Sequence, residues 1–376
     1  MKKKKVLFLI ESFIVGGAEK VLIDIVNNLD SGKYDITVCS VYKHSVYKGY
    51  DKSFEKPFKS HIKYRYLINN RIKILYVLFN YLLNKIPNIL YQLFIGNKYD
   101  TLIAFYEGLP TYWVSQTQLK GCKKIAWLHT STELSQKGKS KDELKRQEHY
   151  YAQFNQIVAV SQGVANSFTQ LFPLLKEIVK IIYNPIDCND IKHKSETQCP
   201  IHKIVTPTFI SVGRITEVKG YDRILRVCKL LNEKNYQFQW WIIGGGNSST
   251  LRNTIKQYNL EDRIRLLGHS SNPYPYILNA DYFVSASYTE GWGMAIIEAL
   301  TLNKPVICSN YPAAKEILGN NEYGIIYEQN DEALFNIIEA TITNAQTIKS
   351  IEKKGKNRAY DFDINNQINH ITNVLS

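Results

Sequence analysis

Short apolar runs alternate with amphipathic segments along almost the whole chain, and this rhythm restricts the fold more than any other feature. The runs lack the polar alternation of a half-exposed strand, as expected for strands covered on both faces of a parallel sheet. Strands that alternate with helices form parallel βαβ units with right-handed crossovers. Up to residue 183 the pattern predicts a helix at 18–29 and strands at 6–10, 36–41, 101–105, 124–128, 157–160 and 179–183.

A polar stretch at 184–207, with three prolines and no helical or strand period, interrupts the rhythm, and we interpret it as a connection between domains. The rhythm then restarts, with helices predicted at 221–232, 249–258, 294–300 and 332–341 and strands at 208–212, 238–243, 263–267, 282–285, 305–309 and 324–327. The fold class is therefore α/β, with two doubly wound units in series. Ligands of such sheets bind at the carboxyl ends of the strands, so we expect the site in a cleft between two Rossmann-like domains.

The formal net charge of +13 is unevenly distributed, because eleven Lys or Arg but only two acids lie between Lys43 and Lys98. Such an excess indicates an anionic partner, which could be nucleic acid, a phosphorylated substrate or a membrane surface. The alternative is a solvated basic face. Within this stretch, apolar residues recur at helical spacing: Ile72, Leu75, Tyr76, Phe79, Leu82, Leu83 and Ile86. They belong either to core-facing helices or to a basic, aromatic surface that lies on an anionic bilayer.

The six cysteines form no C-x-x-C pair and have no accompanying histidine cluster, so we do not expect a zinc site. We expect them to be buried thiols in a reducing compartment. The apolar run at 6–10 is too short for the core of a secretory signal. The longest apolar stretch, 74–83, is about half of a membrane span. We therefore predict a cytoplasmic protein without a transmembrane helix.

Two glycine-rich loops follow predicted strands. Gly16-Gly17-Ala18-Glu19 stands before the first helix, where free N–H groups could bind an anion, although a simple tight turn would have the same composition. Gly244-Gly245-Gly246 suggests a dinucleotide fingerprint, but Ser249 occupies the place of its third glycine. A nicotinamide dehydrogenase is therefore only the weaker alternative among enzymes.

Two cations follow the first strand of the second half, in Gly213-Arg214 and Lys219-Gly220. Arginine can bind a diphosphate through its planar fork, and lysine can act as a mobile point charge. The alternative is an ordinary solvated loop.

The segment from Glu290 to Glu298 combines a loop carboxylate, two glycines that leave backbone amides bare at a helix N-terminus, and a second carboxylate within that helix. Carboxylates can hold sugar hydroxyls, since each oxygen accepts two hydrogen bonds. A salt-bridged helix residue is the alternative for Glu298. The acidic pair Asp361-Phe362-Asp363 precedes the terminal helix, where aspartate is a good cap, and we interpret it as structural rather than as a metal site.

Taken together, these motifs resemble those of the retaining glycosyltransferases of family 4, which have the GT-B fold. The resemblance covers nearly the whole chain in the family's order, with Asn184-Pro185-Ile186-Asp187 as a further motif. It implies an acceptor-binding domain at 1–185, a nucleotide-sugar-binding domain at 200–350, and a C-terminal helix within 351–376 that crosses back to the first domain.

The resemblance also implies roles for single residues. Arg214 and Lys219 match the pair that binds the donor diphosphate. Glu298 matches the acid that binds the ribose hydroxyls, and Glu290 the acid near the donor sugar. The remaining donor-side matches are Gly16 and Gly17, the backbone amides of Gly293 and Met294, and His129, which is placed near the sugar. Without the resemblance, a structural histidine is the alternative for His129.

Transfer with retained anomeric configuration and without a metal ion or cofactor is the activity that the resemblance implies. The expected donor is a nucleotide-diphosphate sugar, with UDP favoured over GDP-mannose, and the sugar a hexose or N-acetylhexosamine. The expected acceptor is a glycan linked to a polyprenyl diphosphate, in the synthesis of a bacterial capsule, exopolysaccharide or O-antigen. From its place at the end of another strand of the first domain, Glu107 could touch the acceptor; the alternative is an ordinary loop residue. The protein would be peripheral on the inner face of the cell membrane. Nucleic acid is not expected as a partner. A non-catalytic binding protein is a further alternative.

Overall fold

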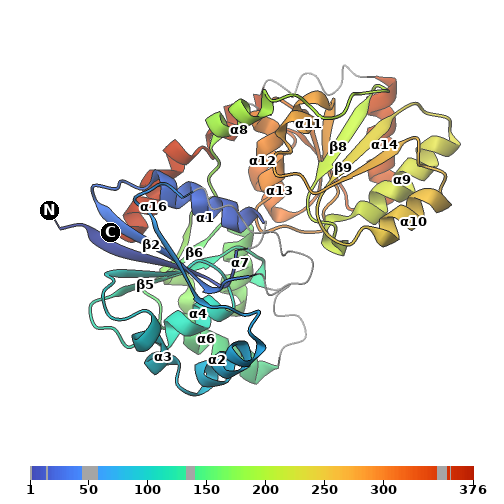
Figure 1. The fold of residues 1–376 in the computed structure, drawn as a ribbon. Coiled ribbons are helices and arrows are strands. Elements are labelled where there is room, and N and C mark those ends of the chain that lie inside the picture. The colour runs from blue at the N-terminus through green and yellow to red at the C-terminus, as the bar shows by residue number, and fades with distance from the viewer. Residues whose placement is uncertain (1, 14–15, 45–57, 133–139, 345–353, 356) are drawn as a thin grey trace. The chain divides into compact units, whose positions relative to one another are not determined.

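A computed structural model describes residues 2–13, 16–44, 58–132, 140–344, 354–355 and 357–376. The chain divides into two compact units. Unit 1 consists of Met1–Pro185 together with Gln367–Ser376, and unit 2 of Ile186–Asn366. Each unit contains one parallel sheet with helices (Figure 1), which confirms the predicted class of two doubly wound α/β units.

The sheet of unit 1 has seven strands in the order β3-β2-β1-β4-β5-β6-β7. All neighbouring pairs are parallel. Strands β4 and β6 are buried throughout, as their largely apolar sequences predict, and the burial includes the polar residues Thr101 and Gln156 that begin them. The strands are β1 (Lys4–Ile10), β2 (Tyr34–Tyr42), β3 (Lys63–Ile68), β4 (Thr101–Ala104), β5 (Lys123–Leu128), β6 (Gln156–Ala159) and β7 (Val179–Ile181).

Helices lie on both faces of this sheet, with α1 and α16 on one side and α4 and α6 on the other (Figure 1). Helix α6 begins at a capping box, in which the Ser140 side chain accepts from the Glu143 backbone and the Glu143 side chain accepts from the Ser140 backbone. The helical elements of unit 1 are α1 (Gly17–Asn28), α2 (Lys73–Lys85), α3 (Pro87–Phe94), α4 (Leu109–Ser115), α6 (Lys141–Tyr151), α7 (Gln162–Leu171) and the short η1 (Pro173–Ile178).

The last helix, α16 (Ile364–Leu375), begins in unit 2 and continues into unit 1. The Lys4 ammonium on β1 donates hydrogen bonds to the carbonyls of Leu375 (2.6 Å) and Ser376 (2.8 Å). The end of the chain is thus fixed to the first strand of unit 1.

The sheet of unit 2 has six strands in the order β10-β9-β8-β11-β12-β13, again all parallel. Its core includes the aromatic rings of Phe209, Trp240 and Tyr282, which stack at centroid distances of 5.0 and 5.5 Å. The strands are β8 (Thr208–Val212), β9 (Gln239–Ile243), β10 (Ile264–Gly268), β11 (Tyr282–Ser285), β12 (Val306–Ser309) and β13 (Ile325–Tyr327). The helical elements are α8 (Cys188–Ser195), η2 (Glu217–Lys219), α9 (Tyr221–Glu233), α10 (Ser249–Gln257), α11 (Tyr274–Asn279), α12 (Met294–Thr301), α13 (Pro312–Leu318) and α14 (Asp331–Thr343).

The structure of the polar stretch at 184–207 differs from our interpretation, which was a connection between domains without helical or strand period. Most of it belongs to unit 2, where α8 begins at an N-cap formed by Asp187, whose Oδ1 accepts from the Asp190 backbone at 2.8 Å. The helix buries Cys188 and Ile191. Its apolar face is only one turn long and most of its residues are polar, so the helical period could not be detected in the sequence.

Within the described residues, no helix has the length and apolar character required to cross a bilayer.

Candidate functional site

The strand order of unit 2 reverses between β8 and β11. Strand β8 pairs with β11 on one side and with β9 on the other, and the chain runs outward from this point in both directions. Ligands of doubly wound sheets bind outside the carboxyl ends of strands at such a switch point. The two loops that follow β8 and β11, residues 213–220 and 286–293, contain four of the candidate residues predicted from the sequence: Arg214, Lys219, Glu290 and Gly293.

These two loops pack directly against each other. The backbone N–H of Tyr288 donates to the carbonyl of Val218 at 2.8 Å. Gly220 has a left-handed backbone with φ of 63°, and a Cβ atom there would lie 2.0 Å from the carbonyl oxygen of Ala286. Only glycine fits this conformation and this close approach. The Lys219-Gly220 motif therefore places Lys219 beside the second loop.

Lys219 and Glu290 form an ion pair at the junction of the loops. The Lys219 ammonium lies 2.8 Å from Glu290 Oε1, and the two side chains are 21% and 19% exposed. The Ser287 hydroxyl donates to the same Oε1 at 2.7 Å. The structure thus brings together two residues that the sequence predicted separately, and it adds Ser287.

Arg214 is exposed immediately after Gly213. Its guanidinium makes no hydrogen bond or ion pair with any other residue that the structure describes. Lys219, by contrast, is paired with an acid, so Arg214 retains all of its donors for an anion.

Helix α12 begins directly after the second loop, at Met294, with Gly293 as its left-handed N-cap. The first amides of a helix lack intrahelical acceptors and bear partial positive charge, so they can bind an anion. Glu298 is buried in the second turn of α12, at 7% exposure, and its Oε1 accepts from the Tyr274 hydroxyl at 3.1 Å. The structure thus shows a carboxylate held within a buried helix, in contact with Tyr274.

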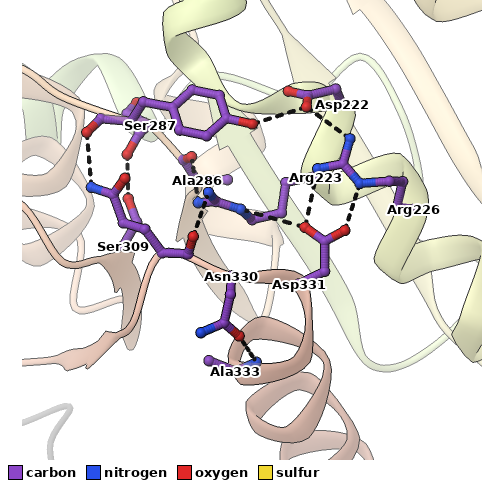
Figure 2. Close-up of polar contacts among 11 residues, drawn as sticks. Asp222, Arg223, Arg226, Ala286, Ser287, Ser309, Asn330, Asp331 and Ala333 are labelled. Atoms are coloured by element: carbon purple, nitrogen blue, oxygen red, sulfur yellow. Dashed lines mark hydrogen bonds and ion pairs between the residues drawn. The ribbon is translucent and has the colours of Figure 1, made fainter.

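A buried arginine supports the loop that contains Glu290 (Figure 2). Arg223 on α9 is 2% exposed and donates to the carbonyls of Ala286 (3.4 Å) and Gln329 (3.0 Å). Its guanidinium lies 4.6 Å from the centroid of the Tyr288 ring, and its Nε is 3.6 Å from Asp331. Arg223 therefore connects α9, the loop after β11 and the start of α14.

Neighbouring contacts extend this support. The Ser309 hydroxyl on β12 donates to the carbonyl of Ser287. The Gln329 side chain donates to the Tyr288 carbonyl at 2.8 Å. The Tyr288 hydroxyl, in turn, bonds to Asp222 at 2.9 Å. The loop is thus held by groups from β12, from α9 and from the segment before α14.

The first glycine of the 244–246 run has a structural explanation, because a Cβ atom on Gly244 would lie 1.8 Å from the carbonyl oxygen of Gly213. The Gly245 carbonyl accepts from the Ile215 backbone at 2.8 Å, and the Ile243 carbonyl accepts from the Gly213 backbone at 2.9 Å. The segment after β9 therefore lies along the loop after β8.

In unit 1, helix α1 begins directly after Gly16, which is its N-cap. A Cβ atom on Gly16 would lie 2.6 Å from Oε2 of Glu19, and Glu19 is buried in the first turn. The Glu19 carboxylate thus lies against the backbone of Gly16 at the start of α1. The donor-binding role of Gly16 and Gly17 stays a prediction.

Glu107 and His129 lie at the carboxyl ends of adjacent strands, β4 and β5, of unit 1. Oε1 of Glu107 accepts from the backbones of His129 (2.7 Å) and Thr130 (2.8 Å) and from the Thr130 hydroxyl (3.0 Å). Oε2 is buried without a hydrogen-bond partner among the described residues. Burial raises the pKa of Glu107, although these hydrogen bonds act in the opposite direction. Glu107 thus joins the loops after the two strands, and its predicted acceptor contact stays untested.

His129 is 8% exposed, between the rings of Phe105 (centroid distance 4.8 Å) and Tyr106 (5.6 Å). Neither ring nitrogen has a hydrogen-bond partner within the part of the chain that the structure describes. Burial lowers the pKa of His129 to about 3, so its imidazole is neutral at physiological pH. A neutral imidazole donates one hydrogen bond and accepts another, which suits a hydroxyl group.

The Asp361-Phe362-Asp363 segment is engaged in local contacts. Asp363 accepts from the backbones of Cys188 (3.1 Å) and Asn365 (3.0 Å), and Asp361 pairs with Arg358 at 2.8 Å. Among the described residues, no group of three or more His, Cys, Asp and Glu side chains could hold a metal ion.

The structure adds three residues that sequence reasoning missed: Ser287, Tyr274 and Arg223. A serine, a tyrosine or an arginine alone is too common to signal a site. Ser287 lies three residues before Glu290, which is the only local signal that could have found it.

Comparison with known families gives two matches that succeed each other along the chain. The model described as Glycosyltransferase Family 4 matches residues 15–190, and the model described as Glycosyl transferases group 1 matches residues 201–358.

Curated relatives match over shorter stretches. The N-acetylgalactosamine-N,N'-diacetylbacillosaminyl-diphospho-undecaprenol 4-alpha-N-acetylgalactosaminyltransferase of Campylobacter jejuni is 28% identical over 216 residues, which are 57% of this chain and 58% of that protein. The capsular polysaccharide biosynthesis glycosyltransferase CapM of Staphylococcus aureus is 30% identical over 165 residues, 42% of this chain and 43% of the relative. The chain thus spans about half the length of these curated relatives.

Among solved structures, HepE of Anabaena in complex with UDP and glucose superposes with a TM-score of 0.74. The superposition covers 99% of each chain at 18% sequence identity. At this identity the similarity concerns the fold.

Proposed function

Because the chain belongs to the family 4 glycosyltransferases, also described as glycosyl transferases group 1, and has their GT-B fold, we propose that it transfers a sugar from a nucleotide-diphosphate donor to a glycan acceptor. The observation that carries the proposal is the cluster at the switch point of unit 2. There, a paired lysine, an exposed arginine, a helix N-terminus and two carboxylates adjoin the ends of β8 and β11.

The cations and amides of this cluster bind the donor diphosphate. Arg214 supplies a fork of donors, Lys219 a second positive charge, and the amides of Gly293 and Met294 the start of α12. As the bond between the sugar and the diphosphate breaks, negative charge grows on the leaving group. Preorganised donors at this place lower the barrier because they stabilise that charge.

The two carboxylates bind hydroxyl groups of the donor. Glu298, aligned by Tyr274, accepts from the ribose hydroxyls, and Glu290, aligned by Ser287 and Lys219, faces the donor sugar. Diphosphate binding draws Lys219 toward the phosphates and frees acceptor capacity on Glu290.

The transfer retains the anomeric configuration. The bond between the anomeric carbon and the diphosphate oxygen breaks, and the acceptor hydroxyl attacks from the same face. Its proton passes to an oxygen of the departing diphosphate, so no metal ion or separate base is needed. His129, neutral and unpartnered among the described residues, binds a sugar hydroxyl, and Gly16 and Gly17 add backbone contacts to the donor.

Printed properties of related proteins support the choice of substrates. HepE was crystallised with UDP and glucose, which favours UDP over GDP as the donor nucleotide. The name of the Campylobacter jejuni relative contains an N-acetylgalactosaminyl group and a diphospho-undecaprenol acceptor. We therefore propose a hexose or N-acetylhexosamine as the transferred sugar and a glycan on a polyprenyl diphosphate as the acceptor, with Glu107 near the latter.

The biological setting is the synthesis of a bacterial surface polysaccharide on the cytoplasmic side of the membrane. CapM, which is named for capsular polysaccharide biosynthesis, and two relatives named for O-antigen biosynthesis support this setting.

A screen of UDP- and GDP-sugars, read as release of the nucleotide diphosphate with and without a lipid-linked glycan, tests the function. We expect acceptor-dependent release of UDP from one sugar donor. Release from none of the sugars, together with a thermal shift by NADH but not by UDP, would overturn the proposal in favour of a nicotinamide enzyme.

A further inference from the structure

The hydroxyl group of Tyr311 is buried without a partner close to the switch point of unit 2. Tyr311 follows β12 and is the N-cap residue of α13, and its side chain is 2% exposed. Its phenol oxygen has no hydrogen-bond partner within the described part of the chain. Buried polar groups nearly always have a partner, because an unpaired hydroxyl costs free energy that a phenylalanine would avoid. Such an exception at the end of a strand next to β11 is a candidate for a role in function.

The phenol reaches the start of α12. A Cβ atom on Gly293 would lie 3.3 Å from the Tyr311 hydroxyl, and Gly293 is the N-cap of this helix. Tyr311 thus lies directly behind the loop that contains Glu290. Because its side chain is almost fully buried, it cannot touch a donor molecule itself and has to act through other residues.

Hydroxyl groups lead from this place toward Glu290. Ser285 and Cys308 are paired residues of β11 and β12, so their side chains lie on the same face of the sheet. The Ser285 hydroxyl donates to the Ser287 hydroxyl at 3.5 Å. The Ser287 hydroxyl donates to Glu290 Oε1 at 2.7 Å. The first of these two links is long, and such links in active sites often shorten only when the substrate is bound.

Tyr311 is protonated and lies close to this line of hydroxyls. Burial, followed by the nearby Cys308 and Glu290, raises the pKa of Tyr311 well above its ordinary value, while Ser285 lowers it. Burial also raises the pKa of Cys308 to about 12. Both groups therefore keep their protons at physiological pH, and the phenol is available as a hydrogen-bond donor.

Glu290 needs such a donor when its ion pair opens. Oε1 accepts from Lys219 and from Ser287, and the proposed function draws Lys219 toward the donor diphosphate. Of these two donors, only Ser287 then remains. Tyr221 on α9 is also near Glu290, but its hydroxyl donates to the Gly213 carbonyl at 2.8 Å. A partly buried carboxylate that loses its cation depends on the strength of its remaining hydrogen bonds.

We propose that Tyr311 is a positioning residue for Glu290 and that its hydroxyl donates to Ser285 when the nucleotide-diphosphate sugar binds. Ser285 then donates to Ser287, which donates to Glu290, and the carboxylate keeps its orientation toward the sugar. We call Tyr311, Ser285 and Ser287 the hydroxyl series. A hydroxyl that accepts a hydrogen bond donates a stronger one, so the series fixes Glu290 more firmly than Ser287 alone would. No proton is transferred. The inference rests on the proposed function, because it requires a donor that draws Lys219 away.

Conservative variants test the inference through the difference between turnover and binding. Y311F removes only the phenol oxygen, and S285A interrupts the hydroxyl series at its middle. We expect each to lower kcat about fivefold, because one hydrogen bond of the series is lost. The Kd of UDP should stay within about twofold of the wild type, since the contacts to the diphosphate are unchanged. The substrate for kcat is the UDP-sugar selected by the screen above, and titration calorimetry with UDP gives Kd.

The double variant Y311F/S285A tests whether the two residues act in one series. If they do, the second substitution removes nothing further, and the double variant should keep the kcat of the single variants. Independent effects would instead multiply, to about 25-fold.

Matched controls make the same changes elsewhere. Y91F removes, in α3 of unit 1, another buried phenol oxygen that has no partner among the described residues. S195A removes, in α8 of unit 2, a buried hydroxyl that donates to the Lys192 carbonyl of its own helix. Both should keep the wild-type kcat. Thermal melting should show Y311F to be at least as stable as the wild type, since its missing oxygen is unpaired in the described structure.

Four outcomes would overturn the inference. Y311F and S285A could keep the wild-type kcat, or their effects could multiply in the double variant. A Y311F protein that loses melting temperature and UDP affinity together would assign Tyr311 to the support of the fold. If C308A lowered kcat as Y311F does while S285A did not, the phenol would serve the Cys308 thiol instead.

Failure of this inference and failure of the proposed function give different results. Unchanged kcat in Y311F, with turnover still lost in R214A and E290Q, would remove the hydroxyl series and leave the transfer activity in place. Wild-type protein that releases nucleotide from none of the sugars would remove the proposed function and this inference with it.

Discussion

The two sheets have similar topologies, but the polar groups at their carboxyl ends have different surroundings. In unit 2, Arg214 is exposed, and Lys219 and Glu290 form a partly exposed ion pair. In unit 1, His129 and Oε2 of Glu107 are buried without partners among the described residues, the pKa of His129 is lowered and that of Glu107 is raised. Burial thus favours neutral groups at the carboxyl end of the unit 1 sheet. At the corresponding end of the unit 2 sheet, greater exposure lets the groups stay charged. Unit 2 is suited to a charged diphosphate, and unit 1 to uncharged hydroxyls.

The largest effect should come from removing charge in unit 2. We expect R214A and E290Q each to lower the rate of donor turnover by about 10²-fold or more, because a preorganised contact to the reacting groups is lost. The measurement is release of nucleotide diphosphate at saturating acceptor. The matched control R252A removes another exposed arginine of the same unit, on α10, and should turn over normally. Near-normal rates in R214A and E290Q would remove the contrast between the units.

The pH dependence of stability should report the buried imidazole of unit 1. Because the folded-state pKa of His129 is about 3, only the unfolded chain gains a proton on this residue as pH falls below the ordinary value near 6.5. The free energy of unfolding of the wild type should therefore fall relative to H129N, by about 2 kcal/mol between pH 7 and pH 5. Urea unfolding of the wild type and of H129N at pH 7 and pH 5 measures this change in the free energy of unfolding.

H370N, which replaces an exposed histidine on α16, is the control for that comparison and should follow the wild type. If the difference in the free energy of unfolding between the wild type and H129N were the same at both pH values, His129 would be solvated. The two sheet ends would then no longer differ.

A smaller effect is expected from the support of the loop after β11. In R223Q, the carbonyls of Ala286 and Gln329 lose an ionic donor, so Glu290 is held less firmly, and the donor KM should rise about tenfold. K229Q is the control, because Lys229 is on the same helix and pairs with Glu233 at the surface. We expect R223K to bring the donor KM part of the way back to the wild-type value, while thermal melting separates folding losses from positioning. Equal KM changes in R223Q and K229Q would contradict a positioning role.

Chelation should have the smallest effect. We expect turnover in excess EDTA to stay within about twofold of the untreated rate, since arginine, lysine and helix amides supply the charge stabilisation that a metal ion would otherwise contribute. Complete loss of turnover, restored by magnesium or manganese, would assign the neutralising charge to an ion.

The sequence predicted the parallel βα architecture because its signals are local. Unbroken apolar runs identified most strands, and the loops at Gly213–Gly220 and Gly291–Gly293 followed from glycines and charges near predicted strand ends. The ion pair between Lys219 and Glu290 was not predicted, although each residue was a candidate by itself. Its formation depends on the neighbouring positions of β8 and β11 in the sheet, which a single sequence does not specify.

Other features depend on contacts between distant residues and could not be predicted. Arg223 was indistinguishable from an ordinary helix residue until the fold placed it against Ala286 and Gln329. The lowered pKa of His129 arises from its burial, which depends on the folded structure around it. The sequence also left open whether the apolar residues of α2 face the core, and the structure divides them between both faces.

The central claim is that the loops after β8 and β11 of unit 2 bind the diphosphate of a nucleotide donor. A crystal structure of the protein soaked with UDP tests it most directly. We predict density for the diphosphate within hydrogen-bond distance of Arg214, Lys219 and the first amides of α12, and density for the ribose at Glu298. Well-defined UDP density elsewhere, with these groups uncontacted, would contradict the claim.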